Sequence, residues 1–129
     1  MIKEAYCSKE VSILLKEKGF NEKCRGGYHY EFDDNDNPIV MLEEWMVQPY
    51  NNDVVDEGFL CSAPTHQMAM AWLREEKNII VNVWYNGVDY NAEYYNDEDE
   101  NFYLITDCLC DSYEETVETA LKYALENLI

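Results

Sequence analysis

The chain has 129 residues, of which 47% are hydrophobic and 14% aromatic, so it carries enough apolar surface to bury one core. Its formal charge is −18, from 27 acidic and 9 basic residues. Such a surface repels phosphate, which disfavours direct binding to nucleic acid or to an anionic membrane and favours a basic protein partner. The sequence has no run of about 20 apolar residues and no apolar N-terminal stretch, so we expect a cytoplasmic protein.

The elements expected in the first half are a helix followed by short strands. Ser8 is a suitable N-cap, and Gly19 followed by Phe20 is typical of a helix C-terminus. Alternating apolar side chains on both sides of an acidic turn predict a hairpin. The expected ranges are a helix at 9–20, strands at 28–32 and 38–47, a loop at 48–57 and a short strand at 58–61.

The second half begins with an amphipathic helix and ends with another. Asn86-Gly87 stands between two alternating runs, which predicts a two-residue type I′ hairpin. Ser112 and Glu115 have the spacing of a capping box before a long apolar stripe. The expected ranges are a helix at 62–78, hairpin strands at 79–85 and 88–95, a strand at 102–107 and a helix from 113 to the C-terminus.

The type I′ turn fixes an expected register in which Tyr85 faces Val88 and Val83 faces Tyr90. One face of this hairpin is then apolar or aromatic and is expected to be covered. The opposite face mixes polar side chains with Trp84 and Tyr95, which we expect to form an exposed aromatic patch.

These elements predict an α+β fold: an antiparallel β-sheet, built from a hairpin and a meander, with about three helices packed on one face. Residues 1–129 are expected to form a single domain. The element order suggests two similar halves of one helix plus antiparallel strands, but the side chains do not match closely enough to define a repeat.

The stretch 32–44 nearly matches a calcium-binding EF-hand loop. Counted from Asp33, oxygen-bearing side chains stand at positions 1, 3 and 5, and Glu44 stands at position 12. Pro38 occupies the position where such a loop needs glycine, and the flanks alternate like strands. We therefore expect an acidic hairpin tip, with a weak cation site of another kind as the alternative.

Five scattered cysteines favour reduced thiols in the core over a disulfide framework. They are Cys7, Cys24, Cys61, Cys108 and Cys110. The close pair at 108 and 110 could chelate a soft metal with Cys7, Cys24, His29 or His66, although a strand end leading into a helix cap explains the same residues. The chain has two histidines: His66 is expected to be an exposed residue in a first helical turn, and His29 lies on a strand.

Three segments, "VSILLKEKGF", "SAPTHQMAMAWLREEKNIIVNVWYN" and "SYEETVETALKYALENLI", carry a family resemblance. Together they resemble small uncharacterised proteins of gut Bacteroides and of their phages and mobile elements. The resemblance implies a compact α+β fold and a bacterial or phage cytoplasm, and it supplies no catalytic residues. The acidic turns at 33–37 and 96–101 are exaggerated relative to that pattern, so any role they have is peculiar to this protein.

The leading hypothesis is a non-enzymatic protein–protein interaction module of bacterial or phage origin, with no catalytic, cofactor-binding or metal-ligating residues assigned. It is expected to be a monomer or homodimer that binds an unknown, basic partner. The candidate interaction surface consists of Asp33, Asp34, Asp36, Trp84, Tyr95, Asp97, Glu98, Asp99 and Glu100. The alternatives are a DNA mimic that inhibits a nucleic-acid-binding protein, and a Cys- or metal-dependent hydrolase built around Cys108 and Cys110.

Overall fold

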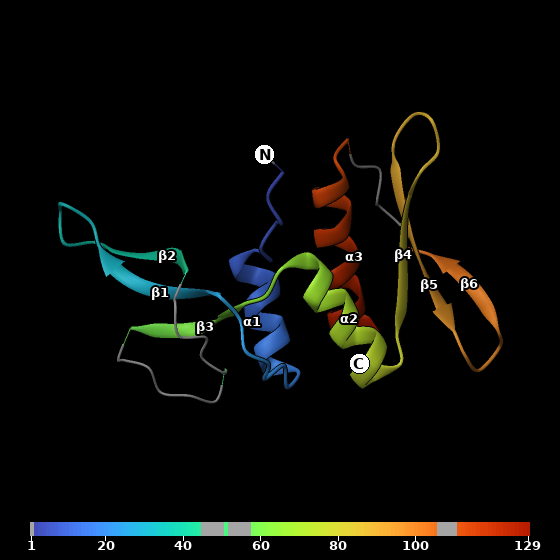
Figure 1. Cartoon of the computed structure of the whole chain (residues 1–129), viewed down its shortest axis with the longest axis horizontal. Helices are drawn as coiled ribbons and strands as arrows, with labels where there is room; N and C mark the ends of the chain where they lie inside the picture. Colours follow the sequence, from blue (N-terminus) through green and yellow to red (C-terminus); the bar gives the residue numbers. More distant parts are fainter. Residues whose placement is uncertain (1, 45–50, 52–57, 106–110) are drawn as a thin grey trace. The chain divides into compact units, whose positions relative to one another are not determined.

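The computed structural model describes residues 2–44, 51, 58–105 and 111–129. These residues form three helices and six antiparallel strands, which confirms the predicted α+β class (Figure 1). The chain divides into two compact units, Met1–Thr65 and His66–Ile129. Within the described residues, no helix is both long and apolar enough to cross a bilayer. The single domain expected over residues 1–129 stays a prediction.

The first unit contains helix α1 (Lys9–Glu17) and strands β1 (Gly26–Phe32), β2 (Pro38–Glu44) and β3 (Phe59–Ala63). As predicted, Ser8 caps the helix, and its hydroxyl accepts a hydrogen bond from the Val11 amide at 3.2 Å. Gly19 adopts the positive φ of 99° that ends the helix and turns Phe20 into the core. The strand order is β2-β1-β3, so β1 lies at the centre of this sheet.

Asn51 lies within the segment expected to be a loop, but it is 5% exposed. Its side-chain amide donates to the Phe20 carbonyl oxygen at 2.6 Å, and its side-chain oxygen accepts from the Ser62 amide at 2.6 Å. One side chain therefore ties the end of α1 to strand β3 and satisfies two backbone groups that would otherwise need other partners. The neighbouring residues 45–50 and 52–57 lie outside the described residues.

The acidic stretch after β1 is a hairpin tip, as predicted, and its flanks are strands rather than the helices of an EF-hand. The Asp33 carboxylate accepts hydrogen bonds from the backbone amides of Asn35 and Asn37, both at 2.9 Å. Asp36 adopts a positive φ of 60°, which Asp and Asn tolerate better than most residues. The acidic residues at this tip are therefore explained in part by turn formation.

The second unit contains helix α2 (His66–Lys77), the meander β4 (Ile80–Tyr85), β5 (Tyr90–Asn96) and β6 (Asn101–Leu104), and helix α3 (Tyr113–Asn127). Helix α3 covers one face of the sheet, which we call the inner face (Figure 1). Ala92, Ile105 and Ala120 form the centre of this packing, with Val83 and Tyr94 partly buried around them. Ser112 caps α3, and its hydroxyl accepts from the Glu115 amide at 3.1 Å.

The predicted register of the β4–β5 hairpin is wrong by two residues. Tyr85 pairs with Tyr90, and Val83 pairs with Ala92. The type I′ turn does not form, because it needs a positive φ at both central residues and of the two only Gly87 has one, at 97°. Instead, the Asn86 side-chain oxygen accepts from the backbone amides of Val88 and Asp89, at 2.8 and 2.9 Å, and a longer loop results.

The strands are divided between two three-stranded sheets, where one sheet was expected. Strand β3 pairs with β1, so the first sheet is complete before the second half of the chain begins. Both units place a helix before three antiparallel strands, but their strand orders differ: the first strand is central in one sheet and at the edge in the other. The resemblance between the halves is therefore one of element order, not of topology.

Candidate functional site

The face of the second sheet opposite α3, which we call the outer face, exposes an apolar cluster. The pairing places Ile80 beside Tyr95 and Tyr95 beside Phe102, in one row across the three strands. The rings of Tyr95 and Phe102 lie 4.9 Å apart. Leu104 lies on the same face as Phe102, and these two residues are 64% and 54% exposed. Large apolar side chains rarely gather in the open on a soluble protein unless something binds them.

Trp84 also lies on the outer face, as predicted, and is 37% exposed. It pairs with Asn91, and the Asn82–Glu93 pair separates it from the row that contains Ile80. Of the two predicted aromatic residues, Tyr95 therefore belongs to the apolar cluster and Trp84 lies at its margin.

The acidic turn (Asp97, Glu98, Asp99, Glu100) joins β5 to β6 and is exposed. It adjoins the row that contains Tyr95, because Asn96 and Asn101 are the last paired residues before it. The Asn96 side-chain oxygen accepts from the Glu98 amide at 2.8 Å, which orders the turn. The Tyr103 hydroxyl donates to the Asp99 carboxylate, and this hydrogen bond raises the pKa of Tyr103 because proton loss would set two negative oxygens side by side.

A hollow of about 360 Å³ opens beside the acidic turn. It lies between the C-terminal end of α2, the end of β5 and the end of α3, and the turn forms one of its walls. Its lining residues include Lys77, Tyr94, Tyr95, Asp97 and Glu98, so one basic residue of the chain already stands among the acidic ones. The side-chain amide of Asn78 donates to the Asp97 carboxylate at the same place.

The remaining predicted surface residues, Asp33, Asp34 and Asp36, belong to the first unit, at the tip of the β1–β2 hairpin. The Asp33 carboxylate is occupied by the turn, and its hydrogen bonds from the Asn37 and Asn35 amides lower its pKa. The predicted surface is thus distributed over both units, and the part that forms a defined face is the one in the second unit.

Three ligand-type side chains converge on the first sheet. His29 and Glu31 lie on β1, and Glu43 lies on β2. The His29 Nε2 atom is 3.0 Å from an oxygen of Glu31 and 3.2 Å from an oxygen of Glu43. The three ligand atoms all lie within 4.8 Å of one another. Of these three residues only His29 stands out in the sequence, although the His-x-Glu spacing on a strand could have indicated the pair at 29 and 31.

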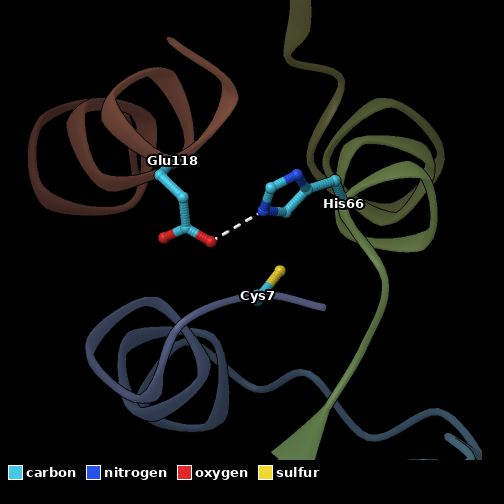
Figure 2. Close-up of side chains that lie close together, drawn as sticks. All are labelled: Cys7, His66 and Glu118. Atoms are coloured by element: carbon cyan, nitrogen blue, oxygen red, sulfur yellow. Dashed lines mark hydrogen bonds and ion pairs between the residues drawn. The ribbon is translucent and has the colours of Figure 1, made fainter. Parts of the chain in front are cut away.

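His66, expected to be an exposed helical residue, is instead 8% exposed. It begins α2, and its Nε2 atom lies 2.7 Å from the Glu118 carboxylate on α3 (Figure 2). The prediction failed because local sequence places a residue in the first helical turn but does not show which other helix packs beside it. Within the second unit this contact ties α2 to α3.

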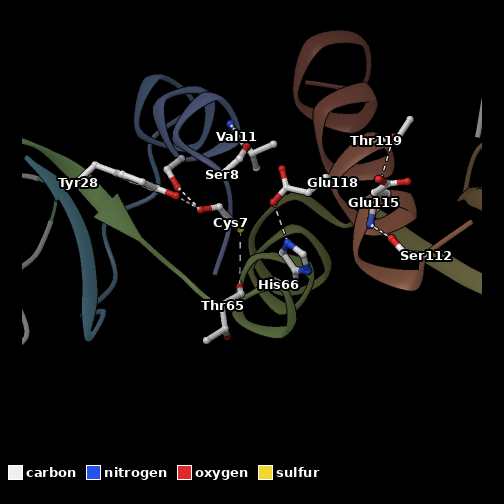
Figure 3. A network of polar contacts seen from close by, with 11 residues as sticks. Cys7, Ser8, Val11, Tyr28, Thr65, His66, Ser112, Glu115, Glu118 and Thr119 are labelled. Carbon is white, nitrogen blue, oxygen red and sulfur yellow. Dashed lines mark hydrogen bonds and ion pairs between the residues drawn. The ribbon is translucent and has the colours of Figure 1, made fainter. Parts of the chain in front are cut away.

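The three described cysteines, Cys7, Cys24 and Cys61, are buried, as predicted. Burial raises the pKa of the Cys24 thiol to about 12 and that of Cys61 to about 11, which makes both thiols unreactive near neutral pH. The backbone carbonyl oxygen of Cys7 accepts a hydrogen bond from the Tyr28 hydroxyl at 2.6 Å (Figure 3). Cys108 and Cys110, the centre of the hydrolase alternative, lie outside the described residues.

Comparison of the chain with protein-family models, with curated proteins and with solved structures gives no match.

Proposed function

We propose that the protein is a non-enzymatic interaction module, of the bacterial or phage origin that its sequence resemblance suggests, and that it binds a basic protein through the outer face of the second sheet. The observation that carries the proposal is the apolar cluster next to the acidic turn, in which Ile80, Phe102 and Leu104 are exposed around the half-buried Tyr95. An exposed apolar centre with a charged rim is the usual anatomy of a protein interface.

The charge of this part of the chain supports a basic partner. No lysine or arginine occurs from residue 78 to residue 121, so Glu93, the one charged residue of β4, β5 and β6, and the acidic turn bring only negative charge to this sheet. A partner with lysine or arginine side chains around an apolar centre would be attracted over a distance and oriented on approach. The apolar cluster would then supply most of the affinity, because a few buried aromatic anchors dominate binding energy.

The test compares two variants in which an exposed phenylalanine is replaced. Phe102→Ser removes an anchor from the outer face, whereas Phe32→Ser removes a 71% exposed phenylalanine from the first sheet and serves as the control. Both variants and the wild type are used as bait in cells that produce the protein naturally. A specific partner should be lost with Phe102→Ser and kept with Phe32→Ser, with affinity reduced on the order of tenfold or more.

The affinity for the partner should also fall as salt increases, since the attraction is between exposed opposite charges. If Phe102→Ser and Phe32→Ser capture the partner equally well, the outer face is not the binding surface. If this protein instead competes with DNA for the nucleic-acid-binding site of the partner, the DNA-mimic alternative is favoured.

A further inference from the structure

We propose that His29, Glu31 and Glu43 form a binding site for a divalent transition-metal ion of the zinc class. The site lies in the first unit and is independent of the interaction face proposed above. Its three ligands come from two neighbouring strands that the β1–β2 pairing holds in a fixed register.

The register explains why the three side chains meet. His29 and Glu31 are two residues apart on β1, so they project from the same face of the sheet. Glu43 pairs with Gly27, which lies on that same face and has no side chain. The glutamate can therefore extend diagonally over Gly27 and reach the imidazole ring.

The distances match those between ligands of one metal ion. With metal–nitrogen and metal–oxygen bonds of about 2.0–2.2 Å, two ligands at a tetrahedral or octahedral angle lie roughly 2.8–3.6 Å apart. The separations of 3.0 and 3.2 Å between the His29 nitrogen and the two glutamate oxygens fall in this range. The ligand oxygens of Glu31 and Glu43 also lie within 4.8 Å of each other.

The charges also favour a cation at this position. Both carboxylates approach the same ring nitrogen, Nε2, which can offer at most one hydrogen atom to them. From residue 26 to residue 73 the sequence contains no lysine or arginine, so neither β1 nor β2 supplies a cation to the second carboxylate. A divalent ion would balance both negative charges and take the lone pair of the neutral imidazole.

The three side chains of the proposed site differ in burial. The His29 side chain is 10% exposed and is therefore held in place, while those of Glu31 and Glu43 are 46% and 44% exposed. An ion can enter from the carboxylate side, and water molecules can complete its coordination. Because one ligand is imidazole nitrogen, zinc-class ions should be preferred over calcium and magnesium, which favour oxygen ligands alone.

The experiment is a calorimetric titration of the full chain with Zn²⁺ in a background of ~5 mM Mg²⁺, which occupies sites made only of carboxylates. The variants are His29→Gln, Glu31→Gln and Glu43→Gln. Glu44→Gln is the matched control, because it removes the same charge from the next residue of β2, on the opposite face. Zinc binding should be lost with His29→Gln and weakened by roughly tenfold or more with either ligand glutamate replaced, but unchanged with Glu44→Gln.

A second measurement separates this site from zinc bound by cysteine. Co²⁺ is added in place of Zn²⁺, and the NMR signals of the His29 ring are followed; a paramagnetic ion at this site shifts or broadens them at one equivalent. Circular dichroism without metal checks that each variant is folded; if His29→Gln is not, the Glu31→Gln/Glu43→Gln double variant replaces it. Unchanged Zn²⁺ affinity in the folded variants, or Co²⁺ binding that leaves the His29 signals untouched, would overturn the proposal.

Discussion

At the residue scale, single side chains decide how the turns and the loop are held. Asp33 and Asn86 are both first residues of tight connections, and each uses a side-chain oxygen to accept two backbone amides. Asn51 also binds two backbone groups, but in the interior: it donates to the Phe20 carbonyl oxygen after α1 and accepts from the Ser62 amide of β3. The first two are recognisable in the sequence as turn-forming residues, whereas the third is not, because the sequence does not show that its segment passes through the core.

The Asp33 turn should respond to acid. The pKa of the Asp33 carboxyl in the folded protein lies below its ordinary value of about 4. The ionised carboxylate therefore stabilises the folded state at pH values above the ordinary pKa. This contribution is lost as the pH falls through the lower pKa of the folded state. Thermal melting between pH 6 and pH 2 should therefore show a smaller acid-dependent loss of stability for Asp33→Asn than for Asp34→Asn. Identical pH profiles for the two variants would contradict this role.

Replacement of Asn51 should be costly. Asn51→Ala removes two hydrogen bonds of 2.6 Å and leaves the Phe20 carbonyl and the Ser62 amide without the partner that Asn51 supplies. We expect the free energy of unfolding to fall by about 2–4 kcal/mol, measured by denaturant titration. Asn35→Ala, at an exposed position of the hairpin tip, is the control and should change it little. A loss no larger than that of the control would show that the interior contact is dispensable.

At the scale of elements, helix α3 is the most clearly encoded part of the molecule. Its N-cap and its apolar stripe are both local features, and Val117, Ala120 and Leu121 are fully buried as the stripe predicts. One of the two hydrogen bonds of the capping box is present: the Ser112 hydroxyl accepts from the Glu115 amide. The apolar face of the β4–β5 hairpin was predicted correctly around Ala92, although its register was not, since a shift of two residues keeps every side chain on the same face. Nearer the hairpin tip the expected cover is lacking, because Tyr85 is 56% exposed.

The cap of α3 makes a simple prediction. Ser112→Ala should lower the free energy of unfolding by about 1 kcal/mol, whereas Ser112→Asp should retain most of it because aspartate is also an effective N-cap. Equilibrium unfolding in urea would measure both. Equal destabilisation by alanine and aspartate would mean that the side-chain oxygen does not act as the cap.

At the scale of the whole molecule, charge is the dominant property. With 27 acidic and 9 basic residues, repulsion between exposed carboxylates opposes the compact state at low ionic strength. Raising the salt concentration from ~10 to ~200 mM shortens the range of that repulsion, so the melting temperature should rise. Potassium chloride and sodium chloride should act alike, because the effect is screening. A melting temperature that falls with both salts would refute net repulsion as the controlling term.

Some residues of the candidate sites can be selected from the sequence and others cannot. Trp84, Tyr95 and the acidic turn could be selected from alternation and charge, and the structure places them on one sheet of the second unit. Phe102 and Leu104 were missed as surface residues, because their face depends on the pairing of β6 with β5. Glu31 and Glu43 were missed as partners of His29, because 27 acidic residues give no reason to choose these two before the strands are paired.

The sequence by itself determined the α+β class, the helix caps, the acidic hairpin tip and the apolar face of the second hairpin. These depend on interactions within a few residues, such as a cap, a turn or a periodic apolar pattern. Only the tertiary structure decided the division into two sheets, the hairpin register, the outer apolar cluster and the meeting of His29 with two glutamates. The physical reason is that these depend on which strand edges pair, and pairing joins residues that are distant in the chain.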